Sequence, residues 1–207
     1  MQFNKELLDA LLPHVVTLVA AFGGAWFAFV WQNRAEKRKE SENNYAAILL
    51  IQATFYRYYS VIAELHAHLI SMPDDTKLRK IDFVKSFPEI NYSNLSLILQ
   101  TKDPDLFEHI AQMHRNCASA IDSVEVWNAQ YLTVTLESKI EHIQENTCTL
   151  STDPRKYALF QDYTKIMRRD VSQETLTKIL ALDKSIKLFI KTYFPKKHAL
   201  QLDFVEN

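Results

Sequence analysis

The sequence predicts an all-α protein with one transmembrane helix near its N-terminus, and three observations lead to this prediction. Residues 10–31 contain no Asp, Glu, Lys or Arg. Both glycines of the 207-residue chain, Gly23 and Gly24, fall inside this run. The other residues therefore lack the amino acid that hairpin turns favour, and their apolar side chains recur at steps of three and four, which is typical of helices.

The apolar run is long enough to cross a membrane. At a rise of about 1.5 Å per residue it reaches about 33 Å, and a hydrocarbon core is about 30 Å thick. We expect Pro13 to begin this helix, because proline is tolerated in a first turn. Lys5 alone precedes the run, whereas four basic residues follow it closely: Arg34, Lys37, Arg38 and Lys39. This asymmetry predicts a single-pass protein with its N-terminus outside and most of the chain in the cytoplasm.

A cleaved signal peptide is the alternative for this run, since Lys5 and several small residues have suitable positions. The run is longer than the usual apolar region of a signal peptide, which has about 7–15 residues. It also ends in bulky aromatic residues that suit a membrane interface: Trp26, Phe27, Phe29 and Trp31. These features favour a membrane span.

The rest of the chain is predicted to form a series of helices. Residues 32–42 extend the spanning helix, and residues 45–72 form an amphipathic helix that Pro73 ends. Short helices are expected at 78–87 and 93–100. Asp103 has the position of an N-cap before Pro104, so a long helix is expected from there to about residue 146, with a break near Trp127 left open. Residues 147–153 form a loop, and two further helices cover 154–169 and 172–194.

The distribution of charge divides the chain further. Residues 154–207 carry 11 Lys or Arg against six Asp or Glu, whereas the residues before them carry 13 against 19. We therefore expect a transmembrane segment at 1–33, a cytoplasmic helical bundle at 34–150 and a basic C-terminal helical module at 151–207. Cys117 and Cys148 lack metal-ligand spacing and are expected in the core.

One face of the predicted span carries small or polar residues throughout. They recur at helical steps and are the candidate oligomerisation and pore-lining residues: His14, Thr17, Ala21, Gly24 and Ala28. One interpretation is a simple anchor with incidental alanines. The other is self-association of several copies through close helix contacts, in which His14 and Thr17 face a shared axis and line a pore.

Enzymatic motifs are missing from the sequence. Two membrane glycines exclude the glycine-rich phosphate loops and the nucleophile elbow. His66 and His68, like His109 and His114, have spacings that do not suit a metal pair on a helix. We therefore expect no enzyme, no metal and no cofactor.

Residues 91–100, residues 103–107 and the helix reaching Tyr131 resemble the layout of HEPN-like helical domains. In that superfamily a motif of Arg, then Asn or another polar residue, three residues, then His supplies ribonuclease chemistry. Asn128 matches the second position of the motif, but Trp127 replaces the arginine and Leu132 the histidine. The resemblance therefore implies the fold without the nuclease activity.

The whole layout resembles small bacterial membrane effectors of antiphage defence. Two such families combine one N-terminal span with a cytoplasmic helical domain: the membrane pore accessory of type VI-B CRISPR systems and channel effectors like Hailong protein A. In the second, the C-terminal part binds an oligodeoxynucleotide made by a partner nucleotidyltransferase, and the basic module favours this family. The resemblance implies a homo-oligomer in the bacterial inner membrane.

The basic module also suits a polyanion on physical grounds, since Lys184, Lys187 and Lys191 share one helix face. The candidate nucleic-acid-binding residues are Arg155, Lys156, Arg168, Arg169, Lys184, Lys187, Lys191, Tyr193, Lys196 and Lys197. A solvated charged face and contact with anionic lipid are the alternatives. The sequence thus predicts an oligomeric ion channel gated by a nucleic-acid or oligonucleotide signal. A membrane-tethered adaptor that conducts nothing is the alternative, and a tethered ribonuclease would need an unrecognised site.

Overall fold

The computed structural model describes residues 5–71, 81–82, 90, 92–137, 139–144, 147–151 and 154–201. The chain divides into two compact units, Met1–Ala46 and Ala47–Asn207. The predicted all-α class is confirmed, since the described residues are mostly helical. Their order is α1 (Lys5–Ser71), α2 (Tyr92–Lys102), α3 (Pro104–Glu137), β1 (Lys139–Gln144), β2 (Thr147–Ser151), α4 (Pro154–Asp170) and α5 (Gln173–Tyr193).

Helix α1 is continuous from Lys5 to Ser71, so the prediction that Pro13 begins the helix is wrong. Pro13 lies inside α1, where it removes one backbone hydrogen bond. The hydroxyl of Thr17 donates to the Pro13 carbonyl over 2.7 Å. No other stop signal occurs before Pro73, so the expected span, its extension and the amphipathic helix form one element.

Capping residues explain where α3 and α5 begin. The backbone N–H of Leu106 donates to the Asp103 carboxylate over 3.0 Å, which confirms Asp103 as the N-cap of α3. Ser172 caps α5 by accepting a hydrogen bond from the Thr175 N–H. Helices α2, α4 and α5 agree with their predicted ranges within two residues at each end.

The C-terminal end of α3 differs from the prediction. The helix passes Trp127 without a break and ends at Glu137 rather than near residue 146. Strands β1 and β2 follow and pair antiparallel, from Lys139 opposite Ser151 to Gln144 opposite Thr147. In β2, Cys148 and Leu150 alternate with polar residues, a pattern with a period of two that favours a strand even without glycine. The loop predicted at 147–153 is therefore largely a strand.

Most of the short helix predicted at 78–87 lies outside the described residues. Ile81 and Asp82, which are described, are not helical.

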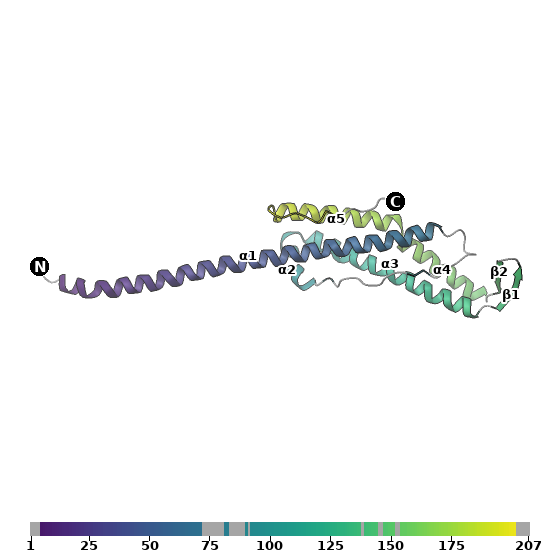
Figure 1. The fold of residues 1–207 in the computed structure, drawn as a ribbon, viewed down its shortest axis with the longest axis horizontal. Coiled ribbons are helices and arrows are strands. Elements are labelled where there is room, and N and C mark those ends of the chain that lie inside the picture. Colours follow the sequence, from purple (N-terminus) through teal and green to yellow (C-terminus); the bar gives the residue numbers. More distant parts are fainter. Residues whose placement is uncertain are drawn as a thin grey trace. The chain divides into compact units, whose positions relative to one another are not determined.

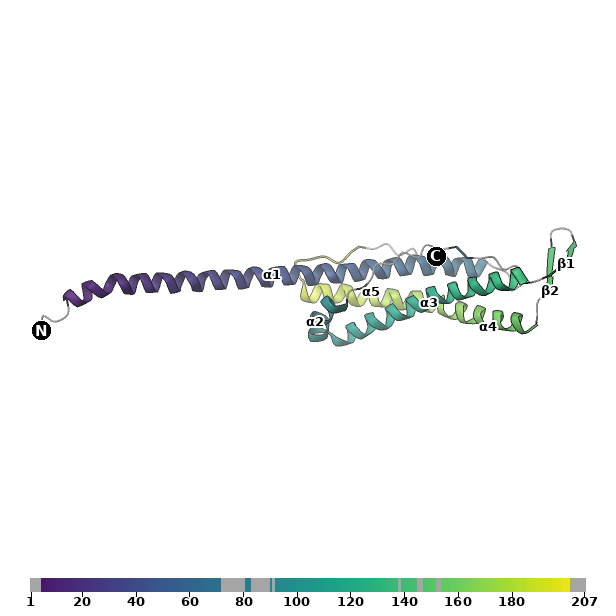
Figure 2. The same ribbon diagram turned by 90° about the horizontal axis from the view of Figure 1, so that it is seen from below.

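The second unit is a bundle of long helices (Figure 1). Helix α3 packs against α4 and also contacts α2 and α5. Trp127 of α3 is completely buried, its ring centroid lies 5.5 Å from that of Phe160, and its indole nitrogen donates to the Thr164 hydroxyl over 3.0 Å. Figure 2 shows α5 alongside the part of α1 that belongs to this unit. Helices α4 and α5 therefore share one core with α3.

Candidate functional site

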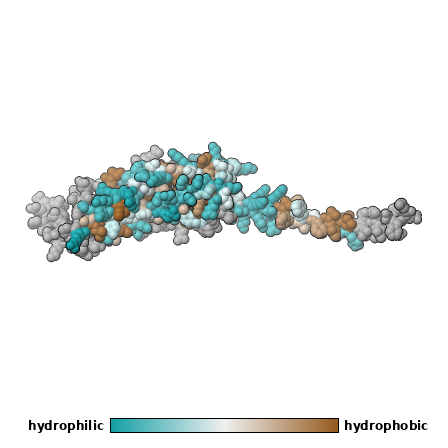
Figure 3. Space-filling view, turned by 180° about the vertical axis from the view of Figure 1, so that it is seen from behind, coloured by the Kyte–Doolittle hydropathy of each residue, from teal (hydrophilic) through white to brown (hydrophobic). Residues whose placement is uncertain are grey.

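The apolar segment of α1 is uncovered within the chain. Apart from the half-buried Val30, its large side chains between Val15 and Trp31 are 56–70% exposed, and none of its most apolar window is buried. Figure 3 shows hydrophobic side chains grouped on this part of α1, next to a hydrophilic stretch. Exposure of so much apolar surface to water is unfavourable. The segment is long and apolar enough to cross a membrane.

The small and polar stripe of this segment lies on the surface of α1. All five of its members are exposed: His14, Thr17, Ala21, Gly24 and Ala28. A Cβ atom built on Gly24 would meet nothing within 4 Å, and the same holds for Gly23. Neither glycine is therefore required by a close approach within the chain.

The basic residues of α4 and α5 fall into separate groups. Arg155 lies near the start of α4, and Arg168 and Arg169 lie in its last turn, where all three are exposed. The side chain of Lys156 is outside the described set. The second group occupies the C-terminal half of α5 and the residues after it: Lys184, Lys187, Lys191, Tyr193, Lys196 and Lys197. Because α5 is about 30 Å long, Arg168 and Arg169 before it and the second group at its end lie at opposite ends of one helix.

Two members of the second group have roles inside the fold. The ammonium of Lys187 lies 2.6 Å from the Asp183 carboxylate, whose side chain is only 5% exposed. The hydroxyl of Tyr193 donates to the backbone carbonyl of Lys102 over 3.1 Å, and its ring centroid lies 4.6 Å from that of Phe189. Lys184, Lys191 and Lys196 are exposed and are the more accessible cations of this group.

A buried polar contact beneath these lysines was not predicted. The side-chain amide of Gln52 donates to Asp183 over 2.7 Å, and both residues are buried. The sequence contains a pattern that indicates a buried position for both Gln52 and Asp183. Gln52 follows Ile48 by four residues and precedes Phe55 by three, and Asp183 lies likewise between Ile179 and Ile186. A polar residue within an apolar helical stripe indicates a buried partner elsewhere.

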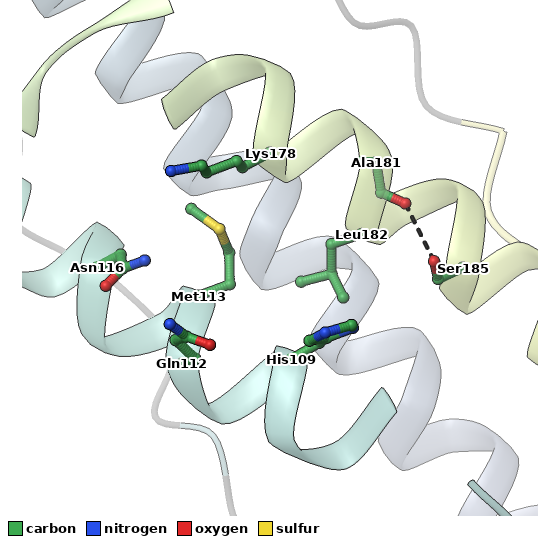
Figure 4. Close-up of a pocket in the computed structure, with 8 residues that line it drawn as sticks. All are labelled: His109, Gln112, Met113, Asn116, Lys178, Ala181, Leu182 and Ser185. Carbon is green, nitrogen blue, oxygen red and sulfur yellow. Dashed lines mark hydrogen bonds between the residues drawn. The ribbon is translucent and has the colours of Figure 1, made fainter. Parts of the chain in front are cut away.

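A groove between α3 and α5 is a second candidate site. Its larger part has a volume of about 340 Å³ and is lined by His109, Gln112, Met113, Asn116, Lys178, Ala181, Leu182 and Ser185 (Figure 4). A neighbouring hollow of about 300 Å³ shares His109 and Ser185 and extends to Asp103 and Asp105. The groove thus has an ammonium at one end and carboxylates at the other, with polar side chains between them.

The residues that resemble the HEPN motif are part of the packing. Trp127 is buried against Phe160. Asn128 binds the backbone of Ile81 through both atoms of its amide, accepting from the N–H over 2.9 Å and donating to the carbonyl over 2.7 Å. Leu132 is exposed. These contacts give Asn128 a structural role in holding Ile81.

A cluster of titratable side chains joins α1, α2 and α3. The Tyr92 hydroxyl and His114 Nδ1 lie 2.6 Å apart, and the ring of Tyr58 meets His114 edge-on. Burial lowers the pKa of His114 and raises that of Tyr92. Burial also raises the pKa of the Cys117 thiol to about 12, so this cysteine stays protonated and acts as a core residue, as predicted. The side chain of Cys148 is outside the described set.

No group of His, Cys, Asp or Glu within the described residues has the arrangement of a metal site. Comparison with known proteins gives no relatives: no family model matches the chain, and neither a curated protein nor a solved structure matches it.

Proposed function

We propose that the protein is a single-pass protein of the bacterial inner membrane that assembles into a homo-oligomeric ion channel and acts in antiphage defence. The observation that carries this proposal is the apolar segment of α1, whose side chains have no cover within the chain. Lipid can cover the bulky side chains, whereas a second helix packs best against the side with Ala21, Gly24 and Ala28. The basic residues after the span favour a cytoplasmic second unit.

The signal that gates the channel is proposed to be a short single-stranded nucleic acid or oligonucleotide, supplied by a partner such as a nucleotidyltransferase. Support comes from the exposed cations in the C-terminal half of α5 and directly after it, chiefly Lys184, Lys191 and Lys196. Clustered cations attract phosphates and release counterions. The partial exposure of Tyr193 leaves part of its ring available for stacking on a base.

Reconstitution of the full-length protein into liposomes tests conduction directly. We expect ion flux that depends on a short single-stranded oligonucleotide and falls when His14 and Thr17 are replaced by Leu and Val. Leu18→Ile with Phe22→Leu is the matched control on the bulky side of the span and should leave the flux unchanged. Equal losses in both variants would indicate an anchor rather than a conduit.

A membrane-tethered adaptor is the second candidate function, and the groove between α3 and α5 favours it. Lys178, which is ion-paired with Glu174, and the pair Asp103 and Asp105 lie at opposite ends of the groove, which suits a peptide with charges of both signs. The mass in detergent separates the two functions, because a monomer cannot form a shared pore. A monomer without flux would establish the adaptor in place of the channel.

A further inference from the structure

The carboxylate of Asp183 is buried between two partners from different elements. One oxygen accepts a hydrogen bond from the Gln52 amide of α1 over 2.7 Å. The other lies 2.6 Å from the ammonium of Lys187, one turn further along α5. Because a buried carboxylate is costly without a counter-charge, the contact with Lys187 stabilises the position of Asp183 beside Gln52.

Gln52 also holds the residues that follow α5. Its amide oxygen accepts from the backbone N–H of Leu200 over 2.9 Å, and its amide nitrogen donates to the Leu200 carbonyl over 3.1 Å. Asp183 shares that nitrogen and so orients the amide. A chain of contacts thus runs from Lys187 through Asp183 and Gln52 to Leu200.

The first member of this chain of contacts belongs to the proposed anion-binding surface. The side chain of Lys187 is 38% exposed and shares a helix face with the exposed Lys184 and Lys191. An anion that bridges these lysines therefore competes with Asp183 for the same ammonium.

We propose that the Asp183–Lys187 pair is a switch by which a bound phosphodiester anion releases Leu200 from α1; this inference rests on the proposed function. A phosphate that takes the Lys187 ammonium leaves Asp183 buried without its cation. Asp183 then moves toward water, and it no longer orients the Gln52 amide. The two hydrogen bonds to Leu200 weaken as a result.

Hydrogen exchange of the Leu200 amide in the full-length protein reads out this switch, because that N–H donates directly to Gln52. Without any ligand, Lys187→Met should accelerate its exchange by about tenfold or more. Lys184→Met, on an exposed position of the same face, is the matched control and should have no effect. Asp183→Asn added to Lys187→Met should restore slow exchange, because a neutral amide needs no cation and can still accept from Gln52. Slow exchange in Lys187→Met would overturn the proposal.

The second arm uses an oligothymidylate of about eight nucleotides, a length within the range that single-stranded sites bind. Its binding should accelerate Leu200 exchange in the wild type and leave it unchanged in Asp183→Asn. Binding without accelerated exchange in the wild type would overturn the switch alone. Failure of the oligonucleotide to bind would overturn the proposed ligand and the proposed displacement of Asp183 from Lys187. The ligand-free variants would still show whether the ion pair between Asp183 and Lys187 holds Leu200.

Discussion

The side-chain amide of Gln52 lies 2.7 Å from the carboxylate of Asp183, a residue 131 positions further along the chain. This contact connects α1, which carries the apolar segment, to α5, which carries Lys184, Lys187 and Lys191. It also makes Lys187 part of the core's electrostatics rather than a freely available surface cation. Loss of Lys187 is therefore expected to disturb the fold as well as any anion binding.

Gln52→Leu should destabilise the protein by about 1–3 kcal/mol, because the backbone groups of Leu200 and one oxygen of Asp183 lose their partner while the buried volume stays similar. Chemical denaturation of the full-length protein in detergent measures this loss. Gln112→Leu, at an exposed position in the groove, is the matched control and should lie within about 0.5 kcal/mol of the wild type. Equal stability of the two variants would mean that the Gln52 contacts contribute nothing.

Asn128→Ala should free the backbone of Ile81, which loses both its hydrogen bonds to the amide. We expect trypsin to cleave after Lys80 at least several-fold faster in this variant, since protease access follows local opening. Asn116→Ala, at an exposed position of the same helix, should leave the cleavage rate unchanged. The same rate in all three proteins would contradict the role of Asn128.

Acidification should destabilise the cluster around His114. Burial holds the pKa of His114 below its usual value of 6.5, so the unfolded chain binds the proton more strongly than the folded one. The stability that comes from neutral His114 is therefore present above about pH 6.5 and is lost as the pH falls below it. His114→Gln, which can still accept a hydrogen bond from Tyr92, should flatten the decrease in melting temperature between about pH 7 and 5. His109→Gln, at an exposed position, should retain the full decrease.

Gly24→Leu should lower the oligomeric order of the detergent-solubilised protein, because a bulky side chain keeps helices apart. A Cβ atom added there meets nothing within 4 Å in the chain itself, so a change in mass reports contacts between copies. Gly23→Leu has equally open surroundings but lies off the stripe of small residues, and it should leave the mass unchanged. An unchanged mass for Gly24→Leu would remove the small-residue face from the proposed assembly.

Local signals were sufficient to predict where several helices begin. Asp103 before Pro104 and Pro154 after an aspartate are cap patterns that act within one turn, and both helices start there. The end of α3 was not predicted, because its helical steps of apolar residues continue into a segment that pairs as a hairpin instead. The preference of that segment for strand depends on its partner strand, which no single window of sequence contains.

The candidate site was predictable only in part, for a related reason. Composition located the basic residues, yet it could not tell the exposed Lys184 from Lys187, whose partner lies beneath it. Asn128 was assigned by its resemblance to a motif, whereas its contacts are with Ile81, 47 positions away. Pairings over such distances follow from tertiary packing, so the pattern near each residue does not contain them.

The two hydrogen bonds between Gln52 and Leu200 determine which amino acids position 200 can accept. The atoms of Leu200 that the Gln52 amide contacts are main-chain atoms, the N–H and the carbonyl, as in pairing with a neighbouring strand. Hydrogen bonds to the backbone do not depend on the side chain, so most residues at position 200 would keep both of them. Proline is the exception, because it has no N–H to offer. In a library randomised at position 200, we therefore expect folded variants with almost every amino acid at that position and a depletion of proline.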